Sequence, residues 1–386
     1  MCDSWMRDIR WETVRRANPF LNVVRLLPLS TSTALVVVIL LVTVIRGAVA
    51  AFDGHLTTVG DTVGFLVDPA MYANLVGTCG IWVFCSRTTS GVKDLFVGLF
   101  DNGIVVADRS QDGSPGDASV AEDWVESLVS AFGSRKLSVW TLVVAGVVVG
   151  SVVLPGYLDR MDDPDAWSMA SLPSVVFSAV WSLITIYGVF YFVAVCVRSA
   201  HWLSRLFRDF RIEVLPMHPD GIGGLGPIVG FSFRLTAAIV FVGVLIVLTS
   251  VTREYLESGS MGINATADIV VGGICYSLLA PLTFFGITAI PHRAMAAAKA
   301  STLDTVAKSF RSLDSEVMTT IAKGGRVDPP VIEQLQYLRD VYERASKLPV
   351  WPLSTRNLAR FASTFLVPLL LGACLHLISN FFLATP

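Results

Sequence analysis

Long apolar runs alternate with shorter polar stretches along almost the whole chain. Seven of these runs are long enough, as helices, to cross the roughly 30 Å of hydrocarbon in a bilayer. They cover residues 28–52, 64–85, 137–158, 172–197, 227–251, 269–291 and 361–383. The pattern predicts an all-α, polytopic membrane protein with seven transmembrane helices.

Basic residues collect in alternate gaps between these runs. Of the 29 Lys and Arg residues, 25 fall in the N-terminal segment and in the second, fourth and sixth loops, and two fall in the other gaps. The remaining two, Arg46 and Arg234, lie inside predicted spans. Because cytoplasmic loops are enriched in Lys and Arg, we expect the N-terminus inside and the C-terminus outside. Asp68 and several glycines interrupt the second run, but omitting it would move most basic residues outside.

This topology divides the chain into four regions. They are a cytoplasmic N-terminal segment (1–27), a six-helix transmembrane region (28–291) with cytoplasmic loops 86–136 and 198–226, a cytosolic helical hairpin (292–358), and the seventh helix with its outer tail (359–386).

Composition supports a bilayer partner and a multi-pass cell-membrane location. Hydrophobic residues make up 53% of the chain, charged residues 16%, and the mean hydropathy is +0.63, which is unlike a soluble enzyme. A net charge of −2 gives no indication of nucleic-acid binding. The six cysteines lack metal-ligand spacing, and the last span holds one histidine, whereas a membrane zinc hydrolase needs several. We expect no cofactor, no metal and no enzymatic activity.

Amphipathic segments continue beyond the predicted membrane in the cytoplasmic regions. One helix is expected from Ser119, with Trp124, Leu128 and Phe132 on one face, and helix four is expected to overrun through residues 201–210. Helix six continues as a narrow apolar seam that suits packing on other helices in water. Its members are Leu303, Val306, Phe310, Leu313, Val317 and Ile321.

This seam is predicted to form a hairpin and to hold an oligomer together. Gly324 and Gly325 end its first helix, and Pro329 suits the first turn of the second. Residues Val306, Phe310, Leu313 and Val317 are the candidate contacts between subunits. Pro349 and Pro352 then break the chain at the membrane surface, so the seventh element is split into a cytosolic half and a membrane half. Together with the overrun of helix four, these parts predict one cytosolic bundle.

The most distinctive string joins helix four to helix five, at residues 218–227. Its marked positions are His218, Asp220, Gly221, Gly223, Gly224 and Gly226. A Pro-Asp-Gly turn followed by glycines favours a tight structural loop or a gating hinge. A metal or anion site is the alternative, although the contexts of a phosphate-binding loop and a dinucleotide fold are both missing.

Small and polar residues form a stripe on the last span. Thr364, Gly372, His376 and Ser379 lie within a helical arc of about 120°, at ~100° per residue. Either they line water, as intramembrane ionisable groups often do, or the small residues allow close helix packing. Spans three to seven contain no Asp or Glu, which disfavours an ion-coupled transporter.

The inside-to-outside order, the overrunning helices and the split seventh helix resemble the architecture of insect odorant and gustatory receptors. The resemblance is one of topology, and the Tyr and Gln signature of that family's last helix is absent. It implies a tetrameric, ligand-gated cation channel whose cytosolic helices join the subunits and whose last helix lines the pore. The leading hypothesis is therefore a channel subunit with a small-molecule ligand. A small-molecule transporter, or a sensor that signals through its cytosolic helices, are the alternatives.

Overall fold

The structure is a computed structural model, and its description covers only part of the chain. It describes residues 14, 16–24, 30–57, 64–106, 118–159, 161, 167–168, 170–212, 220, 222–258, 263–324, 326–327, 329–347, 350–351 and 355–383.

The predicted all-α class is confirmed for these residues. The helices are α3 (Pro19–Val24), α4 (Thr31–Phe52), α5 (Pro69–Asp101), α6 (Ala118–Phe132), α7 (Arg135–Val148), the π-helix η1 (Val149–Val153), α8 (Leu154–Leu158), α9 (Leu172–Asp209), α10 (Gly226–Ser258), α11 (Ile263–Ala322), α12 (Pro329–Ser346) and α13 (Thr355–Leu383). The regular β-structure in the described residues is one antiparallel pair of two-residue strands, β1 (Val105–Val106) and β2 (Arg211–Ile212).

Within the described residues, five helical segments are long and apolar enough to cross a membrane. They are Thr33–Phe52, Asp123–Leu158, Leu172–Asp209, Gly226–Leu245 and Thr355–Cys374. Each overlaps one of the seven predicted spans. Most of the predicted span 64–85 falls on α5, which begins at Pro69, and the predicted span 269–291 falls on α11, but neither is among the five. In the case of α11, the side chains of residues 269–273 lie outside the described part of the chain.

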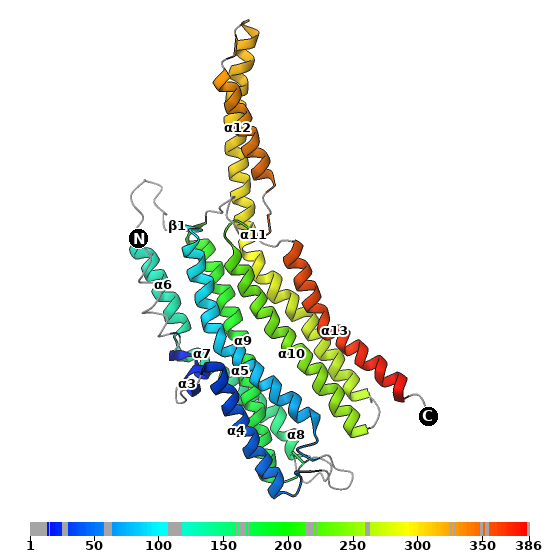
Figure 1. The fold of residues 1–386 in the computed structure, drawn as a ribbon. Coiled ribbons are helices and arrows are strands. Elements are labelled where there is room, and N and C mark those ends of the chain that lie inside the picture. The colour runs from blue at the N-terminus through cyan, green and yellow to red at the C-terminus, as the bar shows by residue number, and fades with distance from the viewer. Residues whose placement is uncertain are drawn as a thin grey trace.

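The long helices lie side by side, with α10 in the interior and α13 at one edge (Figure 1). In their apolar windows, 56% of the α10 residues are buried but only 11% of the α13 residues. Small residues bring α5 close to α10: a Cβ on Gly98 would lie 2.8 Å from the ring of Pro227. The apolar core runs through α5, α9 and α10, and includes Leu95, Leu203 and Ile228.

The third predicted span is one continuous helical segment, in which η1 and α8 directly follow α7. Val153 and Leu154 precede Pro155, which has no N–H to donate to the preceding turn. A π-turn just before a proline is a known way for a helix to absorb this missing donor.

The amphipathic helix expected from Ser119 is present as α6 and packs against the end of the bundle. The ring of Trp124 lies 5.4 Å from that of Trp202 and 5.6 Å from that of Phe210, both near the end of α9. Leu128 is fully buried beside them. The predicted overrun of helix four is also confirmed, since α9 continues to Asp209.

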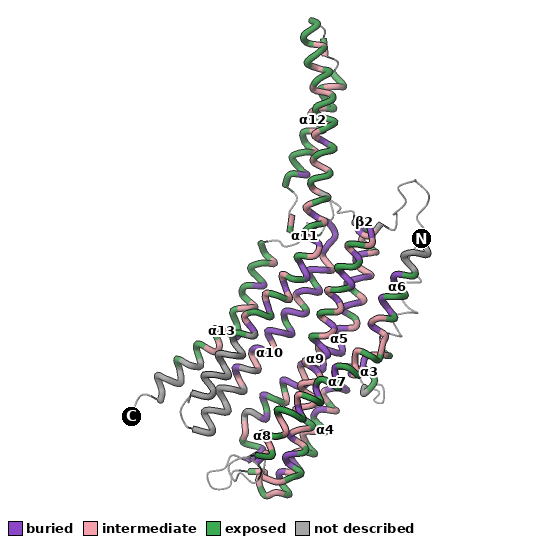
Figure 2. Tube along the Cα trace, turned by 180° about the vertical axis from the view of Figure 1, so that it is seen from behind, coloured by how far each residue is buried: buried purple, intermediate pink, exposed green. Residues whose placement is uncertain are grey.

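The expected single cytosolic bundle is wrong, because the structure has two separate assemblies. The end of α9 packs with α5 and α6, whereas α11 continues beyond the bundle and pairs with α12 alone (Figures 1 and 2). We call residues 293–322 of α11 together with α12 the stalk. Gly324, with φ 71°, ends its first helix as predicted. The two assemblies form because α6 already covers the apolar face of the α9 extension.

Candidate functional site

The glycine-rich loop before α10 is organised by the carboxylate of Asp220. Its Oδ1 accepts the backbone N–H groups of Ile222 (3.0 Å) and Gly224 (2.9 Å), and its Oδ2 accepts that of Gly226 (3.0 Å). Gly226 is the first residue of α10. Asp220 therefore places a negative charge at the N-terminus of this helix, where the helix dipole favours it.

Glycine is required at two positions of this loop because the backbone is left-handed there. Gly223 has φ 72° and Gly224 has φ 89°, and both residues are buried. Asn102, at the end of α5, donates its side-chain N–H to the carbonyl oxygen of Gly224 at 2.8 Å. No sequence pattern indicated Asn102, since only the fold brings it to the loop.

These bonds define what the loop can do chemically. Three of its backbone donors, which an external anion would need, are satisfied by the carboxylate of Asp220. The arrangement is thus that of a tight structural loop that fixes the start of α10. His218 and Gly221, the other marked positions, lie outside the described residues.

Two residues of the polar stripe on α13 are described, Thr364 and Gly372, and both are half-buried. Thr364 is half-buried and donates its hydroxyl to the carbonyl oxygen of Arg360 at 2.8 Å. A Cβ on Gly372 would lie 3.6 Å from Val247 of α10. The side chains of His376 and Ser379 lie outside the described residues. Gly372 therefore lies at the contact between α13 and α10, whereas the Thr364 hydroxyl is satisfied within α13.

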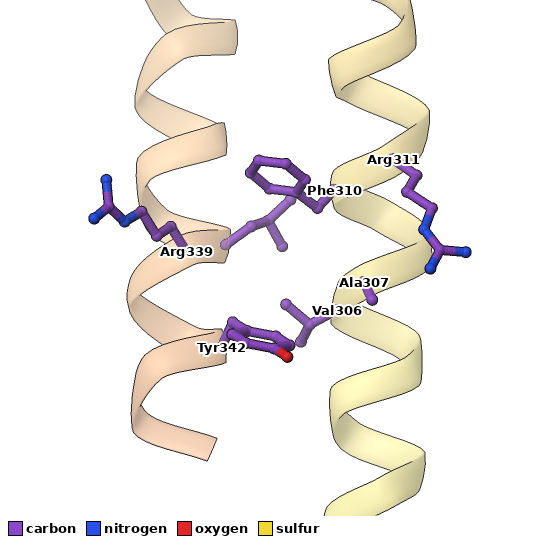
Figure 3. A pocket seen from close by; sticks show the side chains of 7 residues that line it. Val306, Ala307, Phe310, Arg311, Arg339 and Tyr342 are labelled. Atoms are coloured by element: carbon purple, nitrogen blue, oxygen red, sulfur yellow. The ribbon is translucent and has the colours of Figure 1, made fainter. Parts of the chain in front are cut away.

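The stalk has an apolar groove between its two helices (Figure 3). Val306 and Phe310 point from α11 toward Tyr342 of α12, while Arg311 and Arg339 point away from the groove. The space measures about 310 Å³. Val306 is buried, but Phe310 is 37% and Tyr342 46% exposed. Two helices alone thus leave part of the seam uncovered.

The base of the stalk is fixed by contacts between α11 and the segment after α12. The His292 ring stacks on Trp351 with 4.4 Å between centroids, and its Nδ1 lies 2.9 Å from the carbonyl oxygen of Val350. Lys299 donates to the carbonyl oxygen of Ser346 at 2.6 Å. These contacts hold α11 to the end of α12 and to the segment that follows it. The predicted hinge prolines of this segment, Pro349 and Pro352, lie outside the described residues.

A second polar cluster lies at the opposite end of the bundle. The guanidinium carbon of Arg46 sits 4.6 Å from the ring centroid of Trp167, and its Nη2 donates to Ser178 at 3.1 Å. The indole N–H of Trp167 donates to Asp68 at 2.9 Å. One tryptophan thus contacts both a cation and a carboxylate, which stabilises the turn before α9.

The N-terminal segment supplies an anchor that the sequence did not indicate. Asn18 is buried and donates to Thr89 of α5 at 2.8 Å. Phe20 is also buried, with its ring 5.0 Å from that of Trp82 and 5.1 Å from that of Tyr191. This segment therefore packs between α5 and α9.

No group of three or more His, Cys, Asp or Glu side chains suited to a metal ion occurs in the described part of the chain. Comparison with known protein families, with curated proteins and with solved structures finds no match.

Proposed function

We propose that the protein is a multi-pass integral protein of the cell membrane. The observation that carries this proposal is the outward exposure of large apolar side chains on the long helices. Val44, Trp140, Val152 and Leu278 are each 68% exposed, and Leu282 is 69% exposed. Single exposed apolar residues are common, but contiguous apolar faces in water are not. Lipid is the environment that these faces fit.

The proposed topology has seven spans, with α5 and the first part of α11 crossing the membrane as well. The distribution of basic residues supports a cytoplasmic N-terminus and a cytoplasmic stalk. Single cysteines at Asp163 and Ser258, in a cysteine-free background, should react with an impermeant thiol reagent applied to sealed cells. A cysteine at Ser312 should react only after permeabilisation. Labelling of the Ser312→Cys variant in sealed cells would overturn this orientation.

Within this topology, the proposed role is that of a non-enzymatic, ligand-gated cation-channel subunit, assembled as a homotetramer. The support is the resemblance in topology, together with a partly uncovered stalk seam that a further subunit can cover. A pore along Thr364, Gly372, His376 and Ser379 requires α13 to move away from α10, because Gly372 packs against Val247.

Conductance in planar bilayers tests the channel proposal. Purified protein should give cation currents in a screen of small molecules, and modification of a Thr364→Cys variant should reduce them. The matched Leu370→Cys variant, on the exposed face of α13, should be unaffected. Absence of current together with substrate counterflow in the same vesicles would favour a transporter. If neither current nor counterflow occurs, the projecting stalk favours a sensor that signals through its cytosolic helices.

A further inference from the structure

One face of α13 changes its chemistry along the helix. Arg356, Arg360 and Ser363 occupy its first turns, and Val367, Leu370 and Leu377 follow on the same face. All six lie within an arc of about 100°, at ~100° per residue. Each of these six residues is exposed, so the bundle leaves much of this face uncovered. A cationic, polar end thus continues directly into an aliphatic surface.

The two arginines border a hollow of about 720 Å³, which Asn357, Ala359 and Ser363 also line. Phe233 of α10 positions one of them, because the guanidinium carbon of Arg360 lies 5.2 Å from its ring centroid. Within the described part of the chain, no Asp or Glu forms an ion pair with Arg356 or Arg360. The hollow therefore carries two positive charges that no described carboxylate neutralises.

We propose that this face binds one anionic phospholipid, with the phosphate held by Arg356 and Arg360 and an acyl chain along Val367, Leu370 and Leu377. Guanidinium groups match phosphate oxygens in geometry and charge. From Val367 to Leu377 the helix rises by about 15 Å at 1.5 Å per residue, which is half of the ~30 Å of hydrocarbon and suits an acyl chain in one leaflet. Trp351, just before α13, is the type of residue that lies at headgroup level.

The proposal rests on the proposed membrane location, in which the start of α13 lies at the cytoplasmic surface. Anionic lipids of that leaflet attract each nearby Arg by about 1 kcal/mol. Free inorganic phosphate shares the headgroup's chemistry but cannot use the aliphatic part of the face. An anionic lipid therefore fits both the cationic and the aliphatic part of this face.

The test uses the full-length protein in a neutral detergent and native mass spectrometry. Phosphatidylglycerol and phosphatidylcholine with identical acyl chains are added at equal concentrations. The wild type should retain phosphatidylglycerol preferentially. In the R356Q/R360Q variant the preference for phosphatidylglycerol should fall by up to roughly thirtyfold. This factor corresponds to two arginines that each contribute about 1 kcal/mol. A matched R339Q/R344Q variant on α12 removes the same charge and should keep the preference.

Further variants and a competition measurement distinguish the remaining outcomes. If R356Q/R360Q does not fold, R356K/R360K should retain only part of the preference, because Lys keeps the charge without the planar fork. Inorganic phosphate that displaces phosphatidylglycerol at modest concentration would contradict a role for the aliphatic part. An equal preference in wild type and R356Q/R360Q would overturn the site. Release of the protein from membranes by alkaline washing would instead refute the membrane location.

Discussion

At the scale of single residues, Asp220 shows how one side chain can organise a loop. Its two carboxylate oxygens accept three backbone N–H groups, and the third belongs to the first residue of α10. Hydrogen bonds to a charged acceptor contribute more than neutral ones. The glycines of the loop follow from this, since they allow the backbone to curl around the carboxylate.

Replacing Asp220 tests this organisation in a graded manner. Asp220→Ala removes all three acceptors and should destabilise the detergent-solubilised protein by about 1–3 kcal/mol. Asp220→Asn keeps the oxygen that serves Ile222 and Gly224 and should cost less. Asp304→Ala, an exposed carboxylate on α11, should change stability by no more than about 0.5 kcal/mol. Equal melting temperatures for D220A and D304A would show that the loop does not depend on Asp220.

Gly224 provides a second test, because its φ of 89° is strained for any residue with a Cβ. Gly224→Ala should lower stability by about 1–2 kcal/mol. Gly146→Ala in α7 is the control, since a Cβ there would meet nothing within 4 Å and alanine favours a helix. Thermal unfolding of the two variants should differ clearly, and similar unfolding would mean that the loop adapts.

At the scale of elements, α6 illustrates packing by an amphipathic face. Trp124 contacts aromatic rings of both α5 and α9. Trp124→Ala should cost about 3–5 kcal/mol, as expected for a large core side chain, and should expose α6 to proteases. Trp140→Ala, at a position where the indole is 68% exposed, is the matched control. Proteolysis unchanged by W124A would mean that other contacts hold α6.

The stalk is the element whose packing is least complete. Burial of an apolar side chain contributes about 1.5–3 kcal/mol, so the exposed parts of Phe310 and Tyr342 favour a further copy of the stalk. Between residues 301 and 347 the chain has seven basic and seven acidic residues, so two copies do not repel each other. The double variant F310D/L313D should convert an oligomer to a monomer in light-scattering measurements. T319D, at an exposed position off the seam, should not.

At the scale of the whole molecule, the single helix α11 links the bundle to the stalk. It continues through Pro281 and Pro291 for 60 residues. This helix is thus the direct covalent connection between the bundle and the first helix of the stalk. The position of α13 at the edge leaves one of its faces uncovered, and both the proposed lipid site and the proposed pore depend on that edge position.

The sequence by itself determined the helical class, the overrun of α9, the amphipathic α6 and the end of α11 at Gly324. These features follow from local periodicity and from turn residues, which act over a few positions. The sequence did not indicate that the predicted cytosolic bundle is split into two assemblies. Periodicity shows which face of a helix is apolar but not which partner covers that face.

Only the tertiary structure decided the environment of the candidate sites. The Asp220 loop needed Asn102 from the end of α5, and Gly372 of the α13 stripe lies against Val247 of α10 although the same residue type could have faced water. The N-terminal anchor at Phe20 depends on aromatic rings far along the chain. Contacts of this kind join residues distant in sequence, and no local pattern specifies them. The physical reason is that helix faces select their partners by shape and burial over the whole bundle.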